Sequence, residues 1–334
     1  MDIRIYVGAD IAASSIQIDW VNKSNQQSQQ ITLQQHKRDY NRLVKQLTRQ
    51  VADEQIHVVM EATGTYWMAF AEYVQQAGLV VSVLNPSQAK HFAQARLQRT
   101  KTDRADAYLL REYGRVMEPV AWVPPPPICQ QLQQYLNRRD DLILMHNAER
   151  NRLHSLKHNP HALPDLLKPL QTHITNLKQQ IKALEQIIQS LLLNQHDWAE
   201  AVRRLRTIKG LGYLTIARIL TSTHAFARCS TPEAAVAFAG LAPHVRQSGK
   251  WKGKSTIGGG GHAPLRQALY MAALSAARFN PRLHTFYTQL LQRGKLEKVA
   301  LCAVARKLLH LAWVLVVKQR DFDPHWGSQS QLAA

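Results

Sequence analysis

The sequence is poor in cysteine and has no long apolar run. Its 334 residues contain only three cysteines, Cys129, Cys229 and Cys302, which lie far apart in the chain. Neither a disulfide framework nor a Cys-x-x-Cys zinc site is therefore expected. We find no apolar run approaching the roughly 20 residues that span a bilayer, and residues 1–12 lack the pattern of a signal peptide. We therefore expect a cytoplasmic protein without a membrane partner.

Acidic residues are scarce in the C-terminal third of the chain. The net charge is +19. From Arg203 to Arg320 there are twenty Lys or Arg residues but only two acids, Glu233 and Glu297. Such a surface repels itself unless it meets a polyanion, and nucleic acid is the commonest polyanion for a soluble protein. A merely solvated basic surface is the alternative interpretation.

The hydrophobic pattern predicts an α/β domain over residues 1–123. Alternation and turn residues predict strands at 3–7, 16–21, 30–33, 56–60 and 79–84, with helices around 40–51, at 66–76 and from residue 86. The order βββαβαβα is the ribonuclease H-like (RuvC-like) order. It implies a mixed sheet with an active site at strand ends and on a following helix.

Four consecutive prolines at 124–127 mark the end of the α/β pattern and the start of a mostly helical one. Neither a helix interior nor a central strand tolerates such a run of prolines. We assign 124–198 to a linker and coiled-coil arm, 199–322 to a mostly α-helical domain, and 323–334 to a tail. The arm has a heptad seam formed by Leu170, Ile174, Leu177, Ile181, Leu184, Ile188 and Leu191. With the helix expected around 132–156, this seam fits an antiparallel hairpin within the chain or a coiled coil between chains.

Four carboxylates are placed where they can converge. Asp10 and Glu61 each follow an apolar strand segment, and Asp103 and Asp106 lie on one face at the start of a predicted helix. Carboxylates this close repel each other unless hard cations neutralise them, and two Mg²⁺ ions about 3.5 to 4 Å apart would suit phosphodiester chemistry. Mn²⁺ favours the same oxygen ligands. Asp103 and Asp106 could instead be simple acids at a helix N-terminus.

A basic segment in the C-terminal domain contains candidate nucleic-acid ligands and a candidate nucleophile. Ser248 is surrounded in sequence by Arg246, Lys250, Lys252 and Lys254, and Arg266 follows on the next predicted helix. Cations beside a hydroxyl lower the cost of its alkoxide and bind the phosphate that it would attack. Ser255 in the same segment is a rival, and any surface loop can hold a serine among lysines.

Taken together, these residues resemble a known family. The segments VGADIA, MEATGTYW, KTDRADA and GLAPHVRQSGKWKGKSTIGGGGHAPLR are similar to those of bacterial insertion-sequence transposases that combine a RuvC-like DEDD domain with a serine-bearing transposase domain, relatives of the Piv invertases. The resemblance covers most of the chain. One departure is GADIA in place of the commoner glycine-isoleucine-aspartate or glycine-valine-aspartate, and another is the run of four glycines after Ile257.

The resemblance implies a function for each part. It implies that Asp10, Glu61, Asp103 and Asp106 bind the metal and that Ser248 forms a transient covalent link to DNA. It also implies donor and target DNA as partners, a guide non-coding RNA, and a homo-oligomer in which the serine of one subunit completes the acidic site of another. Two other interpretations remain: a RuvC-like nuclease that needs the acids but no serine, and a non-catalytic nucleic-acid-binding protein.

Overall fold

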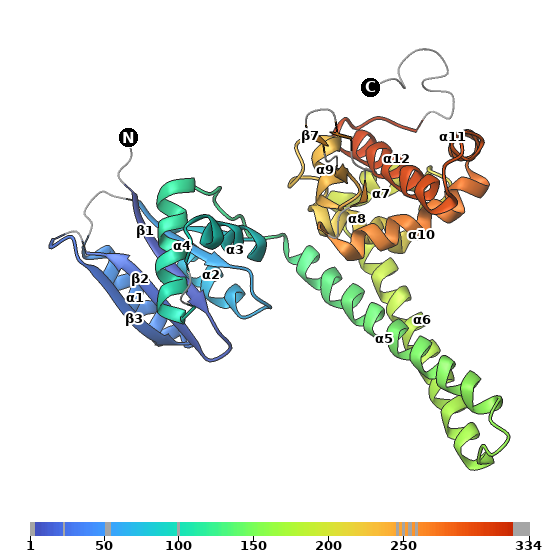
Figure 1. Cartoon of the computed structure of the whole chain (residues 1–334), viewed down its shortest axis with the longest axis horizontal. Coiled ribbons are helices and arrows are strands. Elements are labelled where there is room, and N and C mark those ends of the chain that lie inside the picture. The colour runs from blue at the N-terminus through green and yellow to red at the C-terminus, as the bar shows by residue number, and fades with distance from the viewer. Residues whose placement is uncertain are drawn as a thin grey trace. The chain divides into compact units, whose positions relative to one another are not determined.

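A computed structural model describes residues 4–22, 24–50, 55–98, 101–244, 247–248, 251–252, 256–257 and 260–322. Its contacts divide the chain into two compact units, Met1–Pro124 and Pro125–Ala334 (Figure 1). The proline run lies at this division because it cannot continue a helix or a ladder from either side.

The N-terminal unit is built on a mixed five-stranded sheet. Its strands are β1 (Arg4–Ile11), β2 (Ser15–Val21), β3 (Ser28–Gln34), β4 (Gln55–Glu61) and β5 (Val80–Leu84), in the spatial order β3-β2-β1-β4-β5. β2 pairs antiparallel with both β1 and β3, whereas β4 pairs parallel with both β1 and β5. The α/β class and the mixed sheet predicted from the element order are confirmed.

Helices cover both faces of this sheet. α1 (Lys37–Thr48) and α2 (Trp67–Gln76) pack on one face, and α3 (Pro86–Ala95) and α4 (Asp103–Met117) pack on the other (Figure 1). Local signals set several helix ends: Asn85 forms a capping box with Gln88 at the start of α3, and Thr102 accepts a hydrogen bond from the Ala105 backbone N–H at the start of α4.

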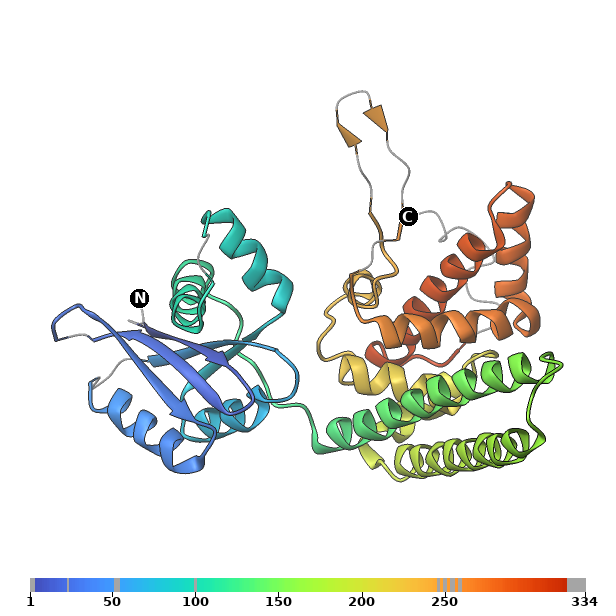
Figure 2. The ribbon, with the colours of Figure 1, turned by 60° about the horizontal axis from the view of Figure 1, so that its bottom comes forward.

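The second unit begins with a long helical hairpin. α5 (Pro127–Lys157) and α6 (Pro164–Leu193) pack along each other within the chain (Figure 2). Every residue of the predicted heptad seam on α6 is buried or half-buried. The sequence left an intramolecular and an intermolecular coiled coil open, and the structure shows the intramolecular pairing. An ion pair of 2.7 Å between Arg139 and Glu185 bridges the two helices.

The base of the hairpin shares one core with the C-terminal helices. Leu132, Leu136, Ile188 and Leu192 belong to the same buried cluster as residues of the following helices. Those helices are η1 (His196–Trp198), α7 (Ala199–Arg206), α8 (Tyr213–Thr223), α9 (Pro232–Phe238), α10 (Ala263–Phe279), α11 (Pro281–Gln292) and α12 (Glu297–Val317). The predominantly helical C-terminal region is confirmed.

α12 corrects one expectation drawn from the sequence. This 21-residue helix is long and apolar enough to cross a membrane by length and composition, although no such run was expected. Half of its most apolar stretch is buried inside the unit, and Val304, Leu308 and Ala312 lie in the core. A central core helix meets the same criterion, so the feature is weak evidence for a membrane span.

Candidate active site

The four predicted acids come from three neighbouring elements. Asp10 is the penultimate residue of β1, Glu61 is the last residue of β4, and Asp103 and Asp106 lie in the first turn of α4. β1 and β4 are parallel, and their last registered pair is Ala9 with Met60, directly before the two acids. Asp10 therefore lies within its strand, paired with Gln17 of β2, and not after it as the sequence suggested.

Strand alternation directs Asp10 and Glu61 to the face that α4 covers. Val7, Ala9 and Ile11 pack into the core on the opposite face, beneath α1 and α2. Asp10 lies between two of them, so its side chain projects to the α4 side. The same argument places Glu61 on that side, because Met60 before it packs into the opposite core.

Two glycines allow α4 to lie unusually close to the sheet. A Cβ at Gly8 would be 1.9 Å from the Ala107 carbonyl oxygen and 2.6 Å from the Arg111 nitrogen. A Cβ at Gly114 would lie 2.6 Å from the Tyr6 ring. The close approach brings the first turn of α4, with its two acids, beside the end of β1. A glycine inside a strand is a sequence signal for such an approach.

A buried ion pair ties the middle of α4 to the sheet. Asp19 of β2 is fully buried, and Arg111 of α4 donates to its carboxylate at 2.5 Å. Ser28 and Gln30 of β3 also donate to Asp19, and Arg111 additionally contacts Glu112 at 3.4 Å. Sequence reasoning assigned no role to Asp19. Its partner lies 92 residues away, so local sequence could not reveal the pair.

Burial and the neighbouring acids together raise the pKa of Asp10 to about 6. Burial is the largest cause, followed by the negative charges of Asp106, Asp103 and Glu61. The pKa of Asp106 is also raised, chiefly by burial, while Lys101 opposes the rise. The site thus holds more negative charge than its surroundings compensate.

The donor set fits a hard divalent cation. All four candidate ligands are carboxylates, which suit Mg²⁺ or Mn²⁺ and favour neither. Across the described ranges, no three His, Cys, Asp or Glu side chains are already arranged to hold a metal ion. The negative charges of the neighbouring carboxylates contribute to the raised pKa of Asp10. A bound cation would relieve this electrostatic repulsion.

The serine-bearing segment contains two short antiparallel ladders that the sequence did not predict. β6 (Pro243–His244) pairs with β9 (Thr256–Ile257), and β7 (Gln247–Ser248) pairs with β8 (Trp251–Lys252) (Figure 2). Ser248 and Lys252 are described by their backbone pairing alone. The predicted ligands Arg246, Lys250 and Lys254, and the rival Ser255, lie outside the described residues.

Arg266 is placed at the base of this segment. Its Nη1 donates to the carbonyl oxygens of Ala239 at 3.2 Å and Gly260 at 2.7 Å. Gly240 and Gly261 both have positive φ, and a Cβ on Gly261 would be 2.5 Å from the Gly240 nitrogen. Arg266 and the two glycines therefore join the two ends of the segment, a structural role that sequence reasoning did not anticipate.

Comparisons with known proteins agree with these features. Residues 7–157 match the DEDD type of the IS110 family, described as a transposase, and residues 202–288 match the transposase IS116/IS110/IS902 family. The chain is 29% identical to the pilin gene-inverting protein of Moraxella bovis over 96% of its own length and 98% of that protein. The Moraxella lacunata protein of the same name is 28% identical over the same shares. An uncharacterized protein of insertion element IS110 from Streptomyces coelicolor is 26% identical over 51% of this chain and 41% of its own.

These matches identify the class of protein as a transposase, a DNA recombinase that catalyses strand transfer. The N-terminal match spans all of the sheet except the first three residues of β1 and includes all four acids, and the C-terminal match spans Ser248 and Arg266. Both matched segments, residues 7–157 and 202–288, are similar to transposases of the IS110/IS116 group. The predicted enzyme class is confirmed, and the DEDD domain indicates dependence on a divalent metal.

Proposed function

We propose that this transposase exchanges DNA strands with two groups of residues: a ribonuclease H-like carboxylate site and a covalent serine. Asp10, Glu61, Asp103 and Asp106 would bind one or two divalent ions. Ser248 would be the nucleophile. The observation that carries the proposal is the gathering of four carboxylates at the ends of β1 and β4 beside α4, with the pKa of Asp10 raised to about 6.

The chain's own residues have distinct tasks in this scheme. A bound divalent ion would supply Lewis-acid stabilisation of charge on the phosphate oxygens. Gly8 and the Asp19–Arg111 pair position the first turn of α4, and with it Asp103 and Asp106. Burial of Asp10 keeps water from screening the negative charge of the site, which strengthens its attraction for a cation.

Ser248 would act on the scissile phosphodiester. Its oxygen forms a bond to phosphorus, one ester oxygen leaves as a hydroxyl, and the serine proton ends on that hydroxyl. The reverse step, with a hydroxyl of the other DNA partner, restores the serine and completes the exchange. The surrounding Lys and Arg residues, with Arg266 at the segment base, would bind DNA phosphates.

The remaining parts of the proposal rest on family resemblance. A guide non-coding RNA would select donor and target DNA, and a homo-oligomer would bring the serine of one subunit to the acids of another. The excess of basic residues from Arg203 to Arg320 provides a surface for such nucleic acids. The sequence around Gly210 and Gly212 resembles the glycine turn of a helix-hairpin-helix element, which makes it a further candidate DNA contact, and Gly210 packs against Ala276.

A covalent trap tests the proposal. The protein is incubated with its RNA, labelled donor and target DNA and Mg²⁺, and then denatured, and label that migrates with protein is measured. We expect an adduct in the wild type that Ser248→Ala abolishes. DNA cleavage without an adduct in the wild type would instead favour a RuvC-like nuclease.

Acid variants test the metal site. Asp10→Asn and Glu61→Gln should abolish strand exchange while nucleic-acid binding is retained, because a neutral amide is a poor ligand for a hard cation. Loss of folding in both variants would show instead that these acids are structural.

A further inference from the structure

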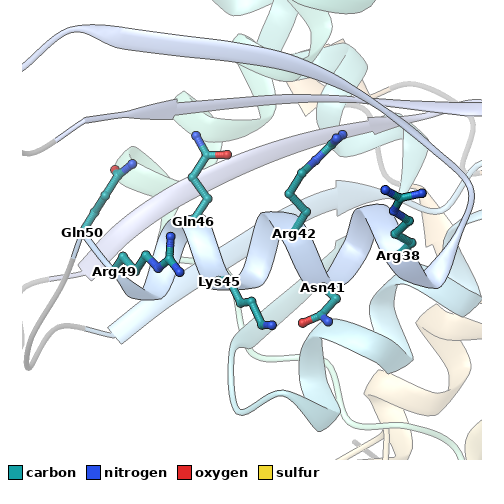
Figure 3. Close-up of a pocket in the computed structure, with 7 residues that line it drawn as sticks. All are labelled: Arg38, Asn41, Arg42, Lys45, Gln46, Arg49 and Gln50. Carbon is teal, nitrogen blue, oxygen red and sulfur yellow. The ribbon is translucent and has the colours of Figure 1, made fainter.

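A row of basic side chains lies on α1, remote from the acidic site. Arg38, Arg42, Lys45 and Arg49 follow each other at spacings of four, three and four residues, which places them on one stripe of the helix. All four are exposed, and they occur on successive turns together with Asn41 and Gln46 (Figure 3). We call the four basic residues the α1 ridge.

The ridge lies opposite the buried side of its helix. Tyr40, Leu43 and Leu47 bury the other side of α1 against the sheet. α1 covers the face of the sheet that α4 does not cover, so the whole sheet separates the ridge from Asp103 and Asp106. The ridge therefore cannot contact a phosphate that is bound at the carboxylates.

The ridge accounts for the positive charge of its unit. Residues 1–124 contain fourteen Lys or Arg and twelve Asp or Glu, a net charge of +2. The segment 37–49 alone contains five basic residues and one acid, a net charge of +4. The remainder of the unit is therefore negative by two charges, and its cationic character is concentrated on α1.

Most of this charge has no carboxylate partner among the described residues. Arg42 forms an ion pair of 3.2 Å with Asp39. In the part of the chain that the structure describes, Arg38, Lys45 and Arg49 form no ion pair with a carboxylate. Like charges on successive turns of a helix repel each other, and a polyanion would remove that cost.

We propose that the α1 ridge binds the phosphate backbone of duplex DNA at a site separate from the acidic centre. The ridge runs through eleven residue steps, or roughly 16 Å at about 1.5 Å per residue. Over roughly that length one DNA strand presents about five phosphates, at about 3.4 Å of axis each. The number and span of the cations thus match a short stretch of one strand.

The occupant follows from the chain's activity. Strand transfer joins two DNA duplexes, so a transposase must hold DNA beyond the phosphodiester that it cleaves. A non-specific backbone contact on the far face of the catalytic domain would position such a flanking or second duplex, because phosphate contacts fix register without reading sequence. This inference rests on the transposase class and not on the role of Ser248.

Salt-dependent binding tests the ridge. The full chain and the variant Arg38→Ala/Lys45→Ala/Arg49→Ala are titrated against a 30-base-pair DNA duplex of arbitrary sequence, between about 50 and 200 mM salt and with EDTA present. Each lost phosphate contact should reduce the slope of log affinity against log salt concentration by about 0.9. The slope of the triple variant should therefore be smaller than that of the wild type by about 2.7. Over this fourfold change in salt, the wild type should lose about 40-fold more affinity than the variant.

Two controls separate charge from other effects. Arg38→Lys/Lys45→Arg/Arg49→Lys keeps the charges and should keep the wild-type slope. Asn41→Ala/Gln46→Ala changes neutral neighbours on the same helix and should also leave the slope unchanged. Because the substituted side chains are exposed, apart from the half-buried Gln46, and alanine favours helices, circular dichroism should show intact folding in every variant.

The outcomes are decisive and independent of catalysis. An unchanged slope in the triple variant would overturn the proposal. So would a loss seen only with an RNA duplex of the same length, which would assign the ridge to RNA. Binding is measured without metal, so an Asp10→Asn variant that kept full strand exchange would refute the proposed chemistry without touching this inference.

Discussion

Asp10→Asn should stabilise the metal-free protein at neutral pH, although Asp10 is a proposed catalytic ligand. The pKa of Asp10 rises from 3.8 to about 6 because of burial and three neighbouring carboxylates. At about 1.36 kcal/mol per pKa unit, this rise lowers the free energy of unfolding of the wild type at neutral pH by at most about 3 kcal/mol. Because Asp10 is only half-buried, solvent screening reduces the expected gain to about 1 to 2 kcal/mol.

The pH dependence has a defined sign. A carboxyl whose pKa is higher in the folded state contributes stability that is complete below about pH 4 and is lost as the pH rises through 6. Asparagine does not titrate, so the variant should become more stable than the wild type between pH 4 and 6. The difference in the free energy of unfolding should level off above about pH 7.

Urea unfolding in EDTA, followed by hydrogen exchange of β1 and β4 peptides, would measure this difference for the N-terminal unit alone. The wild type and the variant should have equal stability near pH 4. A variant that is less stable than the wild type at pH 7, or a difference that does not change with pH, would refute the electrostatic reasoning.

Further predictions concern the metal site, two glycines and the buried ion pair. Adding Mg²⁺ should raise the melting temperature of the wild type at pH 7 and have a smaller effect on Asp10→Asn, as measured by thermal unfolding with and without EDTA. Gly8→Ala should lower the free energy of unfolding by more than about 3 kcal/mol, because the added Cβ would meet the α4 backbone. Gly212→Ala should lower it by less than about 1 kcal/mol, because a Cβ at Gly212 has no atom within 4 Å. Asp19→Asn should cost about 3 kcal/mol, since it leaves Arg111 buried with a weaker partner; equal stability of wild type and variant in urea would show that the pair does not anchor α4.

Some features followed from local sequence because their causes are local. The alternation of apolar residues predicted the strand and helix order of the N-terminal unit, and β1 merely extends beyond the predicted 3–7 to Ile11. Asp103 and Asp106 were expected on one face of a helix start, and Thr102 caps that helix as its position suggests. The apolar stretch of α12 was missed because charged residues within it interrupt the run without interrupting the helix.

The sequence by itself determined the order of the elements, the position of the acids at strand and helix ends, and the concentration of basic residues after residue 203. Only the tertiary structure decided which groups meet. Asp19 finds Arg111 across 92 residues, α4 approaches β1 because Gly8 has no side chain, and α6 pairs with α5 of its own chain. Such contacts depend on how the faces of distant elements pack against each other. The periodicity of a sequence shows which face of an element is apolar, but it does not show which other element that face will pack against.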